Sequence, residues 1–245
     1  ADGGYLDTIL GPDLTLSKHV AELTEGVMEG RTFAFNRFES EVHYYEEPSI
    51  ERTLPAPSPA AWSPLGVRID AQGRALLTDV DSRRHCVREI PEDVIQSPSW
   101  YYFEPVYRVY GETGQDAGQL LFPNSAVADS RGRIHVVDGN NSRISVWDEN
   151  GDFLFFYGKG TAEGALNLPR GAAIDEHDRL HIVDAVGQCV RVYDVSGPEP
   201  QFLFDFGAWG LGDGEFNYPN DIALDGGGRL YIADREGNRI QVWSY

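Results

Sequence analysis

One short pattern recurs five times along this 245-residue chain and constrains its fold more than any other feature. Each copy carries an arginine at the same place. The copies read GRTFAFN from Gly30, GRALLTD from Gly73, GRIHVVD from Gly132, DRLHIVD from Asp178 and GRLYIAD from Gly228. They follow one another at intervals of roughly 50 residues, a period typical of propeller blades. The residues after Arg229 and before Arg31 together make one more interval of similar length, so the repeat predicts a ring.

Each copy is the second of four short β-rich runs that are bounded by turn residues. The first runs begin at His19, Leu65, Asn124, Arg170 and Asn220, the third at Ser40, His85, Ser142, Gln188 and Asn238, and the fourth at Pro48, Pro105, Asp152 and Gln201. The fifth repeat has no fourth run, because the chain ends at Tyr245 just after a third one. The segment GGYLDTILG at 3–11 resembles the fourth run DFLFFYG. We expect it to complete the last blade, which would remove an exposed sheet edge and hold both termini.

The pattern therefore predicts a single all-β domain, a closed β-propeller of five four-stranded blades whose N-terminal strand completes the C-terminal blade. The predicted blades cover about 17–54, 64–111, 122–158, 168–207, and 218–245 together with 3–11.

The segment YPNDIALDGGGRLYIADREGNRIQVWS from Tyr218 resembles an NHL repeat. The resemblance is clear in the third, fourth and fifth repeats and degenerate in the first two. Propellers of the NHL family usually have six blades, so the alternative is a six-bladed ring of which this chain is a fragment.

The charge and hydropathy of the chain exclude some partners. Its net charge is −19, and Lys and Arg never form a run longer than two. Such a surface repels phosphate backbones and anionic lipids, so we expect no nucleic-acid binding. Apolar runs such as FLFFY at 153–157 are far shorter than the roughly 18 residues of a membrane span, so no membrane insertion is expected. The start at Ala1 is compatible with signal cleavage, methionine removal or trimming, and we expect an extracytoplasmic protein, periplasmic or secreted.

A candidate ligand site lies where the first strands begin. In a propeller, the crossings from fourth to first strands share one face, here called the top face, with the turns between second and third strands. The side chains at this mouth of the channel are His19, Leu65, Asn124, Arg170 and Asn220. Three interpretations stay open. The asparagines satisfy backbone groups while Arg170 pairs with a carboxylate; or Arg170, Asn124 and Asn220 bind a small polar or anionic ligand; or the ring holds a metal.

The resemblance implies two kinds of metal site. NHL-like amidating lyases hold zinc with histidines that follow the first-strand proline, where this chain has Leu65, Asn124, Arg170 and Asn220, and only His19 fits. A zinc site needs about three protein ligands. Gluconolactonase-like propellers bind calcium through oxygen ligands that include an asparagine in a position like Asn220 and Asn124. Arg170 between these two asparagines is unfavourable for a cation. We therefore assign no catalytic residue and no cofactor, with calcium at Asn124 and Asn220 as the alternative.

Some polar residues have a structural explanation. Cys86 and Cys189 occupy one point of the third strand in blades that are not neighbours, so both thiols are expected to be free. At that point the third and fifth repeats have Arg143 and Arg239. We expect these arginines to bond the aspartates that end the second strands, which are Asp79, Asp138, Asp184 and Asp234. His135 and His181 are expected to pack between blades.

Aromatic insertions suggest a partner surface. The loop at 95–105, between the third and fourth strands of the second repeat, has Trp100, Tyr101, Tyr102 and Phe103 in succession, and Trp62 and Trp209 lie in two crossings on the top face. Exposed aromatic residues mark interaction surfaces. We therefore expect a protein-interaction or scaffolding module, which could serve as a subunit of a larger complex. The alternative is a channel enzyme, a metal-dependent lactonase-like hydrolase or a lyase.

Overall fold

The computed structural model describes residues 63–81, 84–92 and 108–244, and the backbone of four strands between residues 27 and 55. The chain forms two compact units. The first comprises Ala1–Trp62 and Glu92–Val106, and the second comprises Ser63–Pro91 and Tyr107–Tyr245. Residues 3–11, which we expect to close the ring, lie outside the described residues, as does His19.

The first unit contains one antiparallel sheet in the order β1-β2-β3-β4. Its strands are β1 (Val27–Met28), β2 (Arg31–Asn36), β3 (Glu41–Tyr45) and β4 (Glu51–Pro55). The sheet has the four strands of a blade, which the degenerate first repeat predicts. The strand that pairs with β2 is Val27–Met28, however, and lies later in the chain than the run from His19 that we expected.

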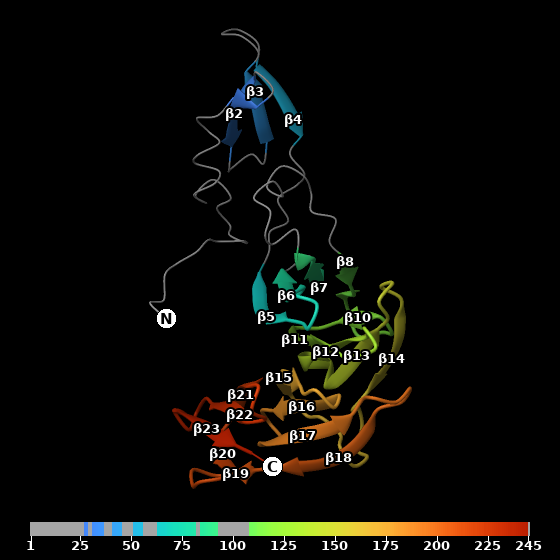
Figure 1. Ribbon diagram of the computed structural model, residues 1–245, viewed down its shortest axis with the longest axis vertical. Coiled ribbons are helices and arrows are strands. Elements are labelled where there is room, and N and C mark those ends of the chain that lie inside the picture. The colour runs from blue at the N-terminus through green and yellow to red at the C-terminus, as the bar shows by residue number, and fades with distance from the viewer. Residues whose placement is uncertain are drawn as a thin grey trace. The chain divides into compact units, whose positions relative to one another are not determined.

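The described residues of the second unit form four larger antiparallel sheets that follow one another along the chain (Figure 1), and two short two-stranded sheets in the crossings between them. Three of them are four-stranded antiparallel blades: β5 (Pro64–Ile69), β6 (Ala75–Asp81), β7 (Arg84–Ile90) and β8 (Arg108–Tyr110); β11 (Pro123–Ala128), β12 (Ile134–Asp138), β13 (Arg143–Trp147) and β14 (Phe153–Tyr157); β15 (Pro169–Ile174), β16 (Arg179–Asp184), β17 (Cys189–Asp194) and β18 (Gln201–Phe206). The last sheet has three described strands, β21 (Pro219–Leu224), β22 (Leu230–Asp234) and β23 (Arg239–Trp243). The order and boundaries agree with the strands that the repeat predicts from residue 64 onward. We keep the repeat numbers and call these sheets blades 2 to 5.

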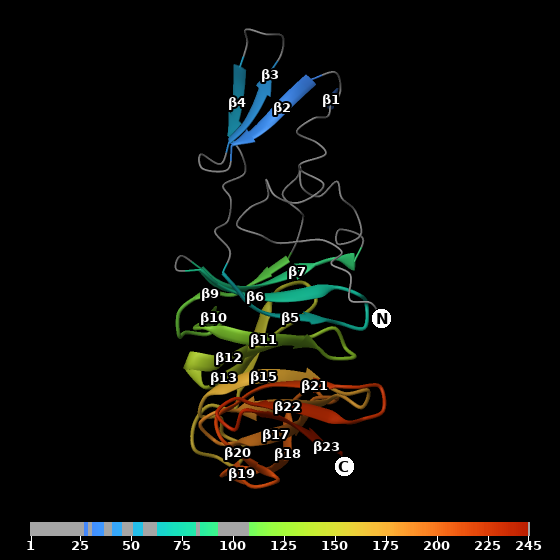
Figure 2. The same ribbon diagram turned by 90° about the vertical axis from the view of Figure 1, so that its left-hand side faces the viewer.

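The first strands of blades 2 to 5 lie side by side, β5 beside β11, β11 beside β15 and β15 beside β21 (Figure 2). Small residues allow this close approach. A Cβ atom on Gly66 would lie 2.4 Å from the backbone oxygen of Asn124, and one on Gly171 would lie 2.6 Å from the Cα of Asp221. Any larger side chain at these two points would push neighbouring blades apart. The second unit is therefore an all-β propeller assembly.

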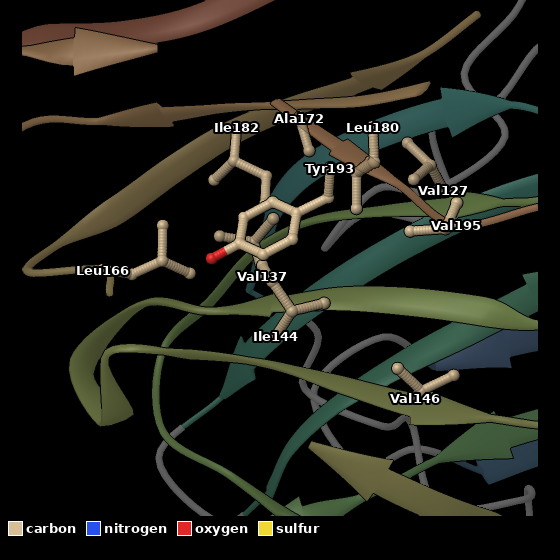
Figure 3. Close-up of a cluster of buried hydrophobic side chains, with 10 residues drawn as sticks. All are labelled: Val127, Val137, Ile144, Val146, Leu166, Ala172, Leu180, Ile182, Tyr193 and Val195. Atoms are coloured by element: carbon tan, nitrogen blue, oxygen red, sulfur yellow. The ribbon is translucent and has the colours of Figure 1, made fainter. Parts of the chain in front are cut away.

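Apolar side chains from adjacent blades fill the space between the sheets. Figure 3 shows the cluster between blades 3 and 4, in which the Tyr193 ring packs among aliphatic side chains from both sheets. The members of this cluster are Val127, Val137, Ile144, Val146, Leu166, Ala172, Leu180, Ile182, Tyr193 and Val195. The Tyr193 hydroxyl donates a hydrogen bond to the carbonyl of Gly164, so the polar end of this buried ring is satisfied.

An aspartate and an arginine repeat in every blade of the second unit. The third-strand arginine donates to the aspartate of the second strand at 2.8 to 3.4 Å in the pairs Arg88–Asp79, Arg143–Asp138, Arg191–Asp184 and Arg239–Asp234. Each aspartate also accepts a backbone N–H from the preceding segment, at Ser63, Leu121, Leu168 and Asn217. The expected roles of Arg143 and Arg239 are confirmed. These pairs tie each crossing to the blade that it enters.

The turns between first and second strands have a second repeated pair. Arginine Nε donates to aspartate Oδ2 at 2.6 to 2.9 Å in Arg74–Asp70, Arg133–Asp129, Arg179–Asp175 and Arg229–Asp225. The arginine that marks the repeat in the sequence is thus a turn residue.

Cys86 lies opposite Asp79 and Cys189 lies opposite Asp184, the register at which Arg143 and Arg239 stand in blades 3 and 5. Both thiols are buried and free, as expected. Burial raises the pKa of the Cys189 thiol to about 11. In the described parts of the chain, no helix has the length and hydropathy of a membrane span.

Candidate functional site

The side chains expected at the channel mouth occupy equivalent places in the structure. Pro123, Pro169 and Pro219 open β11, β15 and β21, and each pairs with the aspartate at the end of the adjacent second strand. Asn124, Arg170 and Asn220 follow these prolines. Backbone hydrogen bonds from Gly139 N to Phe122 O and from Ala185 N to Leu168 O join the turns to the crossings, so both kinds of segment share the top face.

Arg170 and Asn124 are in direct contact. Arg170 Nη1 donates to Asn124 Oδ1 at 2.9 Å, and Asn124 Nδ2 donates to the carbonyl of Phe122 at 2.8 Å. Both ends of the Asn124 amide are therefore fixed. The structure brings together two of the predicted residues, while Asn220 is exposed, Leu65 is 50% exposed on β5, and His19 lies outside the described residues.

Arg170 forms no ion pair with a carboxylate in the described part of the chain. Asp221, on the neighbouring strand β21, is paired with Arg68 instead. The Nε atom of Arg170 is buried and has no hydrogen-bond acceptor among the described residues. Of the three interpretations of this site, the backbone role of Asn124 is present, and the pairing of Arg170 with a carboxylate is not seen.

Tyr218 is a member of this cluster that the sequence did not single out. Its hydroxyl lies 3.4 Å from Arg170 Nη2, and the Arg235 guanidinium lies 5.6 Å from the centre of its ring. Tyr218 has a φ of +56°, and its backbone N–H donates to Gln188 Oε1 at 2.7 Å. A left-handed conformation is costly for an aromatic residue before proline. Phe122 also precedes a first-strand proline, Pro123, and has a φ of +53°. The position directly before this proline is therefore the feature of the sequence from which Tyr218 could have been identified.

The described donors at this mouth are unfavourable for a calcium ion. Asn124 Oδ1 already accepts from the Arg170 guanidinium, and a calcium ion on that oxygen would lie beside this positive charge. Among the described residues, no three His, Cys, Asp or Glu side chains are grouped as metal ligands.

His135 and His181 are buried in the second strands of blades 3 and 4, as expected. His135 Nε2 lies 3.1 Å from Asp129 Oδ2, and His135 Nδ1 lies 3.3 Å from the Tyr157 hydroxyl. Burial lowers the pKa of both histidines.

Two apolar side chains stand exposed on the crossing from blade 4 to blade 5. Trp209 is 74% exposed and Leu211 is 69% exposed. Trp209 ends β19 (Ala208–Trp209), which pairs in parallel with β20 (Glu215–Phe216). Of the aromatic residues predicted to bind a partner, only Trp209 is described, because Trp62, Trp100, Tyr101, Tyr102 and Phe103 lie outside the described residues.

Comparison with known proteins supports the repeat assignment. The family model of the NHL repeat matches residues 216–243, which cover β21, β22 and β23. This match coincides with one blade of an assembly whose other blades have the same strand order and register. The chain is an NHL-repeat propeller. A search among curated proteins finds no match.

Solved structures resemble this NHL propeller in fold. A streptogramin B lyase aligns with a TM-score of 0.52 and 12% identity over 88% of this chain and 65% of the lyase. A catalytically inactive virginiamycin B lyase from Staphylococcus aureus with quinupristin aligns with a TM-score of 0.51 and 15% identity over 90% of this chain and 71% of that one. A gluconolactonase from Xanthomonas campestris has a TM-score of 0.49 and 16% identity over 84% of this chain and 66% of that one. The NHL propeller thus spans less than two thirds of the streptogramin B lyase.

Proposed function

We propose that this NHL propeller is a protein-interaction module whose contact surface includes Trp209 and Leu211. The observation that carries the proposal is the exposure of these two side chains, 74% and 69%, on an ordered segment of the top face. A tryptophan that is mostly exposed on a fixed scaffold is the kind of side chain that dominates binding energy at protein interfaces.

Hydrogen bonds from Arg239 hold the segment that carries Trp209 and Leu211. Arg239 donates to the carbonyls of Leu211, Gly212 and Glu215 at 3.0, 2.7 and 2.8 Å. The Gly212 N–H donates to Glu215 Oε2 at 2.8 Å. A partner that binds here loses little conformational entropy from this loop, because the loop is already ordered.

The crossing from blade 2 to blade 3 provides an internal comparison. It has the same parallel pair, β9 (Glu112–Thr113) with β10 (Gln119–Leu120), and Arg143 donates to its carbonyls at Gln115, Asp116 and Gln119. In this register Thr113 corresponds to Trp209 and Gln115 to Leu211. The loop therefore folds with polar residues at both points. The fold does not require the apolar pair, which supports a role in binding.

The test uses this natural counterpart. The double variant Trp209→Thr/Leu211→Gln copies the blade 2 crossing and should keep the melting temperature of the unchanged protein. A partner recovered with the unchanged chain from its source should then bind the purified double variant at least about tenfold more weakly, or about 1.4 kcal/mol, by calorimetry. Leu154→Ala, on the outer strand β14, is the control and should bind normally. Equal affinity of the double variant would refute the proposal.

Self-association is a separate arm of this test. Sedimentation of the unchanged chain and of the double variant shows whether the partner is a second copy. A dimer that the double variant loses identifies the chain itself as the partner.

The alternative function is a channel enzyme, a metal-dependent lactonase-like hydrolase or a lyase, and it rests on likeness of fold, which does not establish activity. Elemental analysis of protein purified without chelator, with melting curves in calcium, zinc and EDTA, tests it. A stoichiometric metal that Asn124→Ala/Asn220→Ala removes would favour the enzyme.

A further inference from the structure

We propose that Arg170 is the anchor of a carboxylate-binding site at the start of β15, with Asn124 and Tyr218 as its supporting residues. This inference does not rest on the proposed partner surface at Trp209 and Leu211.

The Arg170 guanidinium has more hydrogen-bond donors than the described residues satisfy. A guanidinium has five N–H donors and no acceptor. Two of them are used, toward Asn124 Oδ1 at 2.9 Å and the Tyr218 hydroxyl at 3.4 Å. The Nε donor is buried without an acceptor among the described residues. A buried donor of a charged group without a partner is costly, and such a group in a native structure points to a bound ion or water.

The positive charge of Arg170 is not paired with a carboxylate among the described residues. Most arginines in the described residues bond a carboxylate, including Arg68, Arg143 and Arg239. Arg170 bonds none of the described carboxylates. The carboxylate on the strand beside it, Asp221, is neutralised by Arg68. The positive charge of Arg170 is therefore available to an anionic ligand, although the chain as a whole carries −19.

Hydrogen bonds already hold the two residues that support Arg170, which are Asn124 and Tyr218. The Asn124 amide cannot rotate freely, because its Nδ2 bonds the Phe122 carbonyl while its Oδ1 holds Arg170. The backbone N–H of Tyr218 is held by Gln188 Oε1. When the Tyr218 hydroxyl accepts from Arg170, its own proton is free to donate to a ligand oxygen.

The ligand class follows from the balance of charge. One guanidinium matches one negative charge, and its fork of N–H groups fits the two oxygens of a carboxylate. The Tyr218 hydroxyl, which lies beside this guanidinium, is a neutral donor. Arg235, above the Tyr218 ring, already pairs with Glu236 at 3.3 Å. A phosphate dianion would meet the strongly negative field of the chain with only one free guanidinium, so a monocarboxylate is favoured.

The experiment is a titration of the full chain, labelled with ¹⁵N, with sodium acetate at constant ionic strength. The backbone amides of Arg170 and Tyr218 should shift saturably with acetate. Sodium chloride should leave them unchanged, and inorganic phosphate should bind more weakly than acetate. Arg170→Gln should lose acetate binding at least tenfold. Arg131→Gln is the matched control, because it removes the same charge from an arginine that donates to the Ser196 carbonyl at 3.3 Å on the opposite face.

A second variant keeps the test independent of folding defects. Asn124→Asp places a carboxylate of the same shape against Arg170, so it should keep the melting temperature and still lose acetate binding, because the new side chain occupies the guanidinium. An equal response to chloride and acetate, or unchanged acetate affinity in Arg170→Gln, would overturn the proposal. Phosphate binding tighter than acetate would overturn the assignment to carboxylates.

Discussion

The guanidinium of Arg68, on β5 of blade 2, forms an ion pair with the carboxylate of Asp221, on β21 of blade 5. Arg68 Nε also donates to the carbonyl of Ala172, on β15 of blade 4, at 3.3 Å. One side chain thus links the first strands of three blades. The pair is partly exposed, with 27% of the Arg68 side chain and 49% of the Asp221 side chain accessible, so its strength depends on salt.

Replacing Arg68 with methionine should lower the free energy of unfolding by about 1 to 2 kcal/mol, because bonds to a carboxylate and to two carbonyls of other blades are lost at a partly exposed site. Urea denaturation at low and high salt measures the effect, which should shrink at high salt. Arg229→Met is the control, since it removes an exposed pair within a single turn and should lower the free energy of unfolding much less. Equal losses in the two variants would contradict a linking role for Arg68.

Among the third-strand arginines, replacement of Arg143 should lower the free energy of unfolding most. It is 1% exposed and bonds Asp138, which is fully buried, as well as three carbonyls of the preceding crossing. Burial raises the pKa of Asp138 despite this partner. Arg143→Leu leaves that carboxylate without its cation and should lower the free energy of unfolding, measured by urea denaturation, by about 3 to 5 kcal/mol.

The same substitution at Arg239 provides the comparison, because its side chain is 28% exposed and water can replace part of the lost interaction. We expect Arg239→Leu to lower the free energy of unfolding clearly less than Arg143→Leu does in the same urea denaturation. A larger loss at Arg239 would show that burial does not control the strength of this repeated pair.

Acid should weaken the turns between first and second strands. Backbone hydrogen bonds from Arg229 and Gly227, with the Tyr231 hydroxyl, lower the pKa of Asp225 to about 2. An unfolded aspartate has a pKa of about 3.9. Because the folded pKa is the lower one, this contribution to stability is present above about pH 4 and is lost as the pH falls toward 2. Asp225→Asn should flatten the fall in melting temperature over this window, whereas an unchanged pH profile would exclude this role of Asp225.

Deletion of residues 1–11 tests whether the N-terminal segment completes blade 5. That blade has three described strands, and Ile240 and Val242 on its last one are 62% and 58% exposed. If residues 3–11 supply the fourth strand, the deletion should lower the melting temperature of the whole domain, since it opens the ring and exposes a sheet edge. Deletion of residues 1–2 alone is the control. The same melting temperature in both deletions would refute closure by this segment.

Much of the fold from residue 64 onward could be predicted from the sequence, because each blade is built from local turns and short strands whose pattern repeats. The position of Arg143 and Arg239 opposite the second-strand aspartates followed from alignment of the repeats, and so did the separation of Cys86 from Cys189. These features depend on contacts within a blade, where register is fixed by turns of a few residues.

The sequence by itself determined that this protein is a repeat of four-stranded sheets, that prolines open its first strands, and that Asn124, Arg170 and Asn220 share one structural position. The tertiary structure alone decided that Arg170 bonds Asn124 and Tyr218 and that Arg68 reaches Asp221, 153 residues away. It also decided that Trp209 stands exposed. These contacts join different blades, and they depend on how closely the first strands approach and on which side chains compete for each charge. No local pattern in the sequence encodes that competition.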